Sequence, residues 1–339
     1  MTEKMQELLS ETPLLELFGR CPAARDYLIG LRLETLDANL PYPEAVSCLS
    51  DRCFEEFETS RTEVAETLAV LLETASRERK RREISIGSVR ILGGRDKLGR
   101  PESLDITVSA GETVAVVGPT GAGKSCLLED IECLAQRDTP TGRQVLVDGR
   151  APSDELRFSM DARPVAQLSQ NMNFIMDLTV GEFLSEHAQC RLASESVIKD
   201  VFDCANDMAG ERFSMDTSVT RLSGGQSRAL MIADTLILSF SPILLIDEIE
   251  NAGIDRKRAL NLFRQTGKII FLSTHDPLLA LSVDKRLSVH GGAVDRVISA
   301  SENEREAVRG LEVMDAALQR LREQIRAGET ICTGLSDWL

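Results

Sequence analysis

One glycine-rich run carries the residue types that could bind phosphate. Its pattern is G-x-x-x-x-G-K-S, and its members are Gly118, Pro119, Thr120, Gly121, Ala122, Gly123, Lys124 and Ser125. Glycines let such a loop curl until several backbone N–H groups point at one anion, because no side chain blocks the approach. The lysine adds a positive charge for the phosphates, and the serine hydroxyl is a ligand for Mg²⁺. The run therefore predicts a site for the β and γ phosphates of a nucleotide.

A strand and a helix must position this run. The apolar residues 113–117 precede it and predict a buried strand, and a helical pattern begins near Cys126. A loop in this setting places its N–H groups at the N-terminus of a helix, where the helix dipole also favours anions. The context therefore supports the same prediction as the motif.

Four further stretches follow along the chain. Gln170 comes first, and the next run contains Leu222, Ser223, Gly224, Gly225 and Gln226. An apolar strand then ends in Asp247 and Glu248, and a second apolar strand is followed by His275. In order and spacing, the five motifs resemble the Walker A, Q-loop, signature, Walker B and switch histidine of the ATP-binding cassette (ABC) ATPase family. The resemblance covers about residues 84–298 and implies an α/β fold, namely a P-loop NTPase of ABC type with a mixed sheet core and a helical subdomain.

The resemblance also implies roles for the polar residues of these motifs. Ser125, Gln170 and Asp247 are implied to hold Mg²⁺ beside the bound ATP. Glu248 is implied to polarise the water that attacks the γ-phosphorus, and His275 to contact the γ-phosphate. Gln170 is also implied to sense Mg²⁺ and the attacking water. The expected catalytic residues are therefore Glu248, His275 and Gln170.

Two contacts stay open at this point. Gln167 rivals Gln170 by residue type, although the family-like sequence downstream favours Gln170 as the sensor. Many family members stack an aromatic residue on adenine, but residues 58–157 contain none. The base contact is therefore expected from aliphatic groups or from an arginine such as Arg90 or Arg95.

The signature run carries an inference about quaternary state. One chain holds one Walker A motif and one signature motif. In the family, the signature closes over the γ-phosphate that is bound to the opposite subunit. The resemblance therefore implies a homodimer that forms on ATP binding and sandwiches two ATP molecules. Asp255 fits the D-loop aspartate that couples the two sites of such a dimer.

Composition excludes several classes of partner and location. The 339 residues carry a net charge of −15 and only 4% aromatic residues, which disfavours a nucleic-acid groove. No apolar run approaches the roughly 18–20 residues that span a bilayer, and the N-terminus is acidic and polar. We expect a cytoplasmic protein, or one that lies peripherally at a membrane if it serves a transporter.

The sequence divides into three expected parts. Residues 1–82 read as an all-helical docking domain, and residues 83–300 as the ATPase domain with its helical subdomain at about 171–221. Residues 301–339 form a C-terminal helix and tail, with an apolar stripe at three- and four-residue steps and Gly328 as the cap. The first part is weakly similar to short helical domains of unknown function that are associated with redox or metal proteins, but it lacks the close cysteine pair that they often show.

From these features we expect an ATPase that converts ATP and water to ADP and phosphate and that acts with an unidentified protein partner. The first interpretation is a soluble mechanochemical ATPase that acts on a soluble enzyme, supported by the N-terminal domain and by Ile249, where transport ATPases usually have proline. The alternative is the ATP-binding subunit of an ABC transporter with a membrane subunit, supported by the complete motif set. A third is a low-turnover nucleotide-gated switch, which the presence of both Glu248 and His275 argues against.

Overall fold

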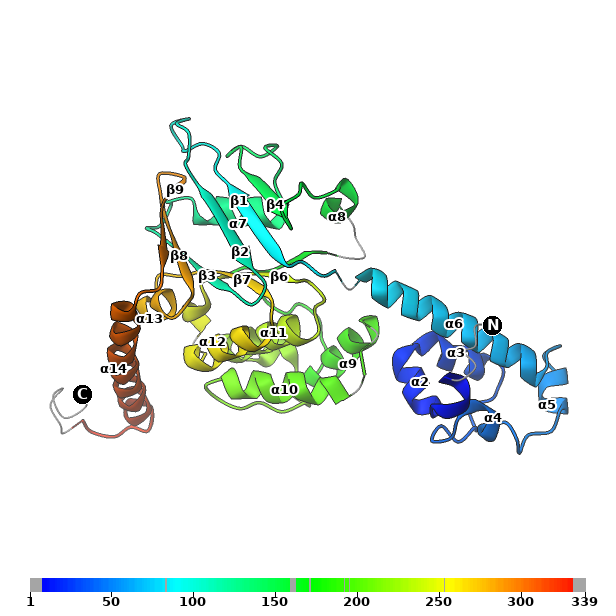
Figure 1. Ribbon diagram of the computed structural model, residues 1–339. Helices are drawn as coiled ribbons and strands as arrows, with labels where there is room; N and C mark the ends of the chain where they lie inside the picture. Colours follow the sequence, from blue (N-terminus) through cyan, green and yellow to red (C-terminus); the bar gives the residue numbers. More distant parts are fainter. Residues whose placement is uncertain are drawn as a thin grey trace. The chain divides into compact units, whose positions relative to one another are not determined.

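A computed structural model describes residues 8–82, 84–158, 163–170, 172–191, 193–194, 196–252 and 254–331 (Figure 1). The chain forms two compact units. One contains residues 1–85, 159–164 and 173–241, and the other contains residues 86–158, 165–172 and 242–339. The domain boundaries expected from the sequence, at 82/83 and 300/301, stay a prediction.

The second unit is built on two sheets. A six-stranded sheet has the order β5-β6-β7-β3-β8-β9, and all its neighbouring pairs are parallel except β8 with β9. Its members are β3 (Thr113–Val117), β5 (Val165–Leu168), β6 (Ile243–Asp247), β7 (Ile269–Ser273), β8 (Lys285–His290) and β9 (Ala293–Ser299). A smaller antiparallel sheet has the order β2-β1-β4, with β1 (Ser88–Leu92), β2 (Asp105–Ser109) and β4 (Gln144–Val147). The mixed α/β core expected from the sequence is confirmed.

The strands of the larger sheet form because their sequences are apolar on both faces. Residues Ile243 to Ile246 and Ile269 to Phe271 are almost completely buried, as central parallel strands require. β1 and β2 instead alternate buried and exposed residues, which is typical of a sheet with one face in water. The parallel order places the carboxyl ends of β3, β6 and β7 side by side at one edge.

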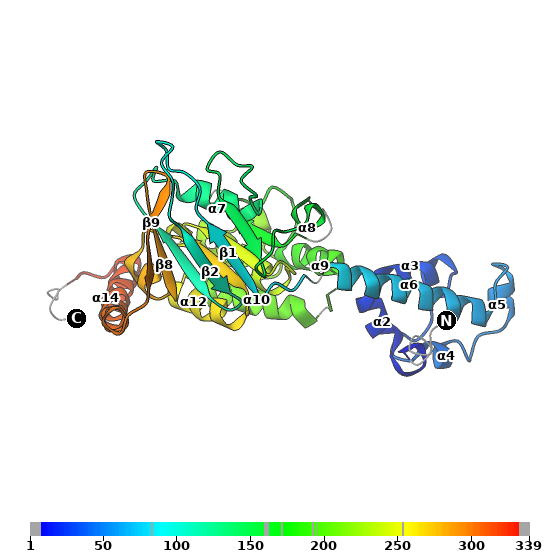
Figure 2. The same ribbon diagram turned by 45° about the horizontal axis from the view of Figure 1, so that its top comes forward.

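The described residues of this unit form five α-helices. They are α7 (Lys124–Glu132), α8 (Asp154–Phe158), α12 (Arg256–Gln265), α13 (Pro277–Leu281) and α14 (Glu302–Arg326). Figures 1 and 2 show α14 on the same side of the unit as β8 and β9. Just beyond α14, Gly328 adopts φ +74° and its N–H donates to the Ile325 carbonyl, so the predicted helix and its glycine cap are both found.

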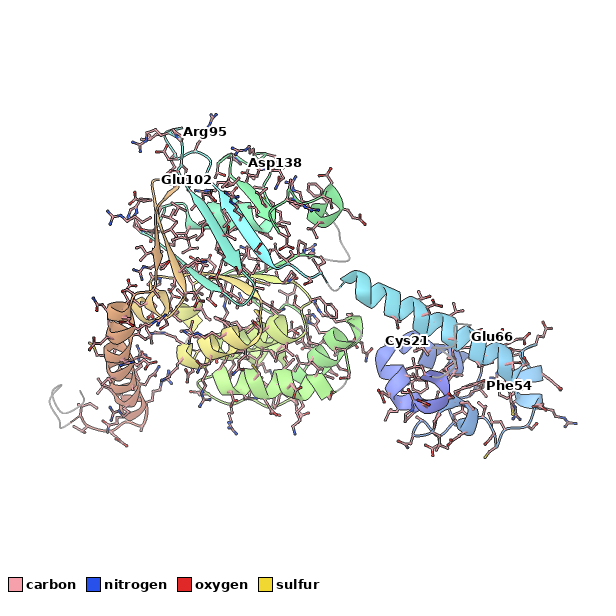
Figure 3. All side chains as sticks on the ribbon, in the orientation of Figure 1. Cys21, Phe54, Glu66, Arg95, Glu102 and Asp138 are labelled. Atoms are coloured by element: carbon pink, nitrogen blue, oxygen red, sulfur yellow. The ribbon has the colours of Figure 1, made fainter. Side chains whose placement is uncertain are left out.

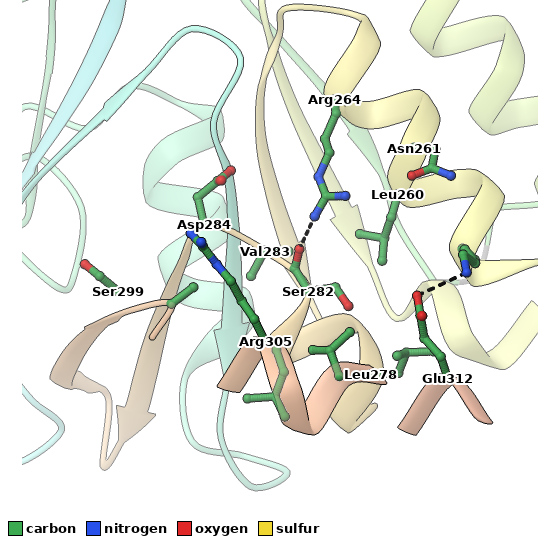
Figure 4. Close-up of a pocket in the computed structure, with 14 residues that line it drawn as sticks. Leu260, Asn261, Arg264, Leu278, Ser282, Val283, Asp284, Ser299, Arg305 and Glu312 are labelled. Atoms are coloured by element: carbon green, nitrogen blue, oxygen red, sulfur yellow. Dashed lines mark hydrogen bonds and ion pairs between the residues drawn. The ribbon is translucent and has the colours of Figure 1, made fainter. Parts of the chain in front are cut away.

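The C-terminal helix packs on its own ATPase core. A pocket of ≈ 470 Å³ lies between α12, α13 and α14 (Figure 4), and Lys257 of α12 pairs with Glu312 of α14 across it at 3.3 Å. Arg256 joins Asp276 at 2.8 Å and Asp315 at 3.4 Å, which ties the same three elements together. Met314 and Leu318, from the predicted stripe, are nevertheless about half exposed.

The other unit is helical. Its N-terminal part contains α2 (Leu14–Arg20), α3 (Pro22–Gly30), α4 (Tyr42–Ala45), α5 (Arg52–Glu55) and α6 (Arg61–Arg82). These helices share one buried core that includes Leu14, Leu28, Phe54 and Leu68. The remaining helices are α9 (Val180–Cys190), α10 (Ser196–Met208) and α11 (Gly224–Ile237). His187 of α9 contacts Asp234 of α11 at 3.0 Å.

Two features bear on membrane and metal binding. No helix in the described part of the chain is both long and apolar enough to cross a bilayer. Across the same residues, no three or more His, Cys, Asp or Glu side chains are grouped so that they could hold a metal ion. The seven cysteines that the structure describes are free thiols (Figure 3 labels Cys21).

A buried ionic cluster joins distant segments of the second unit. Arg143 is completely buried, and its guanidinium donates to Glu102 at 2.8 and 3.0 Å and to Asp130 of α7 at 2.9 Å. It also donates to the Gly292 carbonyl at 2.6 Å. Burial lowers the pKa of Arg143, but the hydrogen bonds and charges of the two carboxylates outweigh this and raise it overall. Arg143 therefore stays charged, and its hydrogen bonds fix the backbone around it.

Replacing Arg143 tests how much this cluster stabilises the fold. Arg143→Met leaves two carboxylates buried without their cation, so we expect a loss of about 3–5 kcal/mol in the free energy of unfolding. Urea denaturation followed by circular dichroism measures it. Arg90→Met is the matched control, because Arg90 pairs with Asp105 at the surface at 2.7 Å. An equal loss in the free energy of unfolding in the two variants would contradict the view that the buried cluster stabilises the fold.

Candidate nucleotide site

The predicted phosphate-binding loop connects β3 to α7. Gly118, Gly121 and Gly123 have φ of +155°, +75° and +106°. A Cβ on Gly118 would lie 2.3 Å from the Val289 carbonyl oxygen, so only glycine fits there. Lys124 begins α7, and its Nζ donates to the Gly118 carbonyl at 2.8 Å. The loop thus curls around its own lysine, and its N–H groups stand at a helix N-terminus, an arrangement that fits a phosphate chain.

A second loop supports this one from the side. In the turn between β8 and β9, the Gly292 N–H donates to the Ala122 carbonyl at 2.8 Å, and Arg143 holds the Gly292 carbonyl. A Cβ on Gly123 would lie 2.9 Å from the Gly292 Cα. The Lys97 ammonium donates to the Gly121 carbonyl at 2.6 Å. The contacts of Gly292 and Lys97 with the loop were not predicted from the sequence. The only local signal for the turn is the glycine pair at 291–292, which follows an apolar strand.

The two acidic residues predicted for catalysis lie at the end of β6. Asp247 is the last residue of the strand and pairs in register with Ser273 of β7, which in turn pairs with Val116 of β3. The Glu248 N–H donates to the Ser273 carbonyl at 3.0 Å. Glu248 has φ +49°, which is uncommon for a residue with a side chain. Such strained residues gather at functional sites, so the backbone supports the predicted importance of Glu248.

His275 follows β7 at the same edge of the sheet. Its ring is 63% exposed, and its Nδ1 lies 2.9 Å from Oε1 of Glu250. The backbone N–H of His275 donates to the same oxygen at 2.7 Å. The structure therefore brings together the loop, the two carboxylates and the histidine, as the order of the strands requires. Glu250 was not among the residues predicted from the sequence.

Gln170 lies two residues beyond the end of β5, which pairs with β6 in parallel register. It is exposed and belongs to the same edge of the sheet as Asp247. Gln167, its rival, sits inside β5 opposite Leu245, and its amide faces Glu132 of α7. The positions favour Gln170 as the residue that is available to a ligand.

The signature run begins α11 in the other compact unit. Ser223 is the N-cap: its hydroxyl accepts from the Gln226 N–H, and the Gln226 side chain accepts from the Ser223 N–H at 2.9 Å. The helix therefore starts at Gly224. Because the cap fixes the exposed Ser223 and Gly224, the first N–H groups of α11 are held in one geometry.

Two other predicted contacts have definite places. Asp255 caps α12, with its carboxylate accepting from the Arg258 N–H at 3.0 Å; Gly253, in the same predicted D-loop, lies outside the described residues. Arg90, offered as a base contact, makes two hydrogen bonds of 2.7 Å to Asp105 of the neighbouring strand. Arg95 is exposed in the loop after β1, where it forms an isolated bridge with Pro101 (Figure 3), and its contact with the base stays a prediction.

Comparison with known proteins agrees with this geometry. The sequence model of the ABC transporter family matches residues 102–251. An uncharacterized ABC transporter ATP-binding protein of Methanocaldococcus jannaschii is 48% identical over 250 residues, which are 73% of this chain and 96% of that protein. The thiamine import ATP-binding protein ThiQ of Haemophilus influenzae is 28% identical over 58% of this chain and 92% of its own length.

A solved structure agrees on the fold. CbiO1 from Clostridium perfringens, part of the ABC transporter complex cbiONQ, superposes with a TM-score of 0.50 at 20% identity, over 72% of this chain and all of that one. The family match, the relative with 48% identity and the shared fold all point the same way. The chain therefore belongs to the ABC family of ATP-binding proteins and is an ATPase.

Proposed function

We propose that this ATPase is the ATP-binding subunit of a membrane transporter. The observation that carries the proposal is the 48% identity, over nearly the whole length of the relative, to a protein described as an ABC transporter ATP-binding protein. The ThiQ relative is likewise described as an import ATP-binding protein. The comparisons give no such support to the soluble mechanochemical ATPase that the sequence alone favoured, and the transporter alternative replaces it.

An exposed apolar segment supports a protein partner. Phe174 packs edge-on against Phe183 of α9, with ring centroids 4.9 Å apart. The next residue, Ile175, is 93% exposed, and Met176 is 40% exposed. Adjacent large apolar side chains that are exposed to water, next to a residue that is packed in place, are typical of interaction surfaces. This segment follows Gln170 closely in sequence, so a partner bound there could sense the nucleotide site.

The site residues fit ATP with Mg²⁺. The loop from Gly118 to Ser125 would hold the phosphates, with Lys124 leaving its own loop carbonyls for the phosphate oxygens. Ser125, Gln170 and Asp247 would hold Mg²⁺, which neutralises charge on the phosphates when bound. Mg²⁺ prefers oxygen ligands, and all three of these side chains supply them.

Hydrolysis is then a matter of placing one water molecule. In the proposed mechanism, Glu248 orients this water and accepts its proton as the water oxygen attacks the γ-phosphorus and the bond to ADP breaks. His275 would contact the γ-phosphate. The signature run, Leu222 to Gln226, would close over the γ-phosphate of a second copy, and Asp255 would couple the two sites.

Glu248→Gln tests both the mechanism and the partner. The amide keeps the shape but cannot take the proton, so we expect kcat to fall by about 10²–10⁴-fold while ATP still binds. Affinity capture with this variant and ATP, from detergent-solubilised membranes of the native host, should recover an integral membrane protein in stoichiometric amount. Glu248→Gln combined with Ile175→Asp is the matched control, and should bind ATP but lose that protein. Recovery of a soluble enzyme in its place would contradict the transporter proposal.

A cysteine beside the loop reports nucleotide binding directly. Cys126 is exposed and follows Ser125 in the first turn of α7. We expect ATP with Mg²⁺ to slow alkylation of Cys126 by iodoacetamide severalfold, measured by mass spectrometry of the digested protein. Cys48 and Cys190 are exposed elsewhere and serve as controls that ATP leaves unchanged. Equal labelling of Cys126 with and without ATP would place the nucleotide elsewhere.

Cys204 should behave differently in the same experiment. Burial, with a smaller contribution from Asp207, raises the pKa of this thiol to about 11. Only the thiolate reacts, so labelling is negligible near pH 7 and should rise about tenfold per pH unit between pH 8 and 10. Fast labelling of Cys204 at pH 7 would show that this part of α10 opens in solution.

A further inference from the structure

Glu250 is a buried acid next to the catalytic residues, and no part of the proposed mechanism uses it. It lies in the short 3-10 turn η2 (Ile249–Ala252), two residues after Glu248. Its side chain is only 4% exposed. Burying a carboxylate is costly unless its partners compensate. The partners should therefore show what the residue does.

All the hydrogen bonds that the structure shows for Glu250 lead to the residues just after β7. Oε1 accepts from the Thr274 hydroxyl at 2.8 Å and from the His275 N–H at 2.7 Å, and it lies 2.9 Å from Nδ1 of His275. A single oxygen therefore holds both the backbone and the ring of the histidine. Within the described part of the chain, the buried Oε2 atom has no hydrogen-bond partner.

The unpaired oxygen argues against a purely structural role. A buried group kept only for stability would be apolar or would have both oxygens bonded. In Glu250 one oxygen is unpaired, and the other accepts the hydrogen bonds from Thr274 and His275. The carboxylate therefore acts mainly on the histidine.

We propose that Glu250 is a positioning residue for His275. By accepting a hydrogen bond from a protonated Nδ1, the carboxylate fixes the tautomer and the plane of the imidazole ring. Nε2 is then the ring nitrogen that is left for the phosphate. This inference rests on the proposed function, in which His275 contacts the γ-phosphate. In this role Glu250 acts through the ring of His275. Because η2 follows directly after Glu248, the same turn orients the histidine and continues the strand end that holds the catalytic carboxylate.

A set of variants tests this role by steady-state kinetics. Glu250→Met keeps the volume, removes the acceptor and leaves no buried charge, so it should fold. We expect its kcat to fall about tenfold or more with KM for ATP within about twofold, because a misplaced group chiefly weakens the transition state. Glu250→Gln retains an acceptor oxygen and should recover most of that kcat. Glu112→Met, which removes a carboxylate that is paired with Lys285 away from the site, should leave kcat unchanged.

The double variant separates positioning from a general effect. If Glu250 acts through the ring, Glu250→Met adds little further loss once His275→Ala is present, so the two effects are strongly non-additive. Independent, multiplying losses would overturn the proposal. So would wild-type kcat in Glu250→Met, or an increase, which would mean that the contact restrains His275. His275→Ala with wild-type kcat would instead overturn the role of His275 in the proposed function.

A measurement on the unaltered protein needs no variant to fold. Nitrogen-15 NMR of the imidazole rings distinguishes a protonated Nδ1 from a bare one. We expect the His275 signal to show a protonated Nδ1 at neutral pH. A ring protonated only at Nε2 would overturn the proposal, because such a ring cannot donate to Glu250.

Discussion

The close approach of the β8–β9 turn to the phosphate-binding loop is the constraint on which the rest of the site depends. The Gly292 N–H holds the Ala122 carbonyl, and Gly123 has no room for a side chain against Gly292. The turn is itself held by Arg143, whose other bonds reach Glu102 and Asp130. A loop made largely of glycines has few side chains of its own that could stabilise it, and Lys124 supplies the hydrogen bond to the Gly118 carbonyl. The surrounding backbone and a buried charge cluster supply that stability instead.

Much of the site could be predicted from the sequence because its signals are local. The glycine run, the strand ending in two carboxylates and the histidine after a strand each carry their meaning within about ten residues. The N-cap at Ser223 and the helix end at Gly328 are local in the same way, since capping involves residues three or four apart.

The supports could not be predicted because they join distant parts of the chain. Arg143 and Gly292 are 149 residues apart, and Glu250 and His275 are 25 apart. Nothing in the local sequence distinguishes Arg143 from a surface arginine such as Arg90. The contact between Glu250 and His275 forms only when β6 and β7 pair and bring residue 250 beside residue 275.

We propose that ATP is bound between two chains, by the phosphate-binding loop of one and the signature run of the other, because each chain has one of each, in different compact units. The most direct test is the mass of Glu248→Gln in solution, measured by light scattering with and without ATP and Mg²⁺. We predict the mass of one chain without nucleotide and twice that mass with it. A Glu248→Gln protein that binds ATP yet keeps the mass of one chain, while the wild-type protein hydrolyses ATP as a single chain, would contradict it.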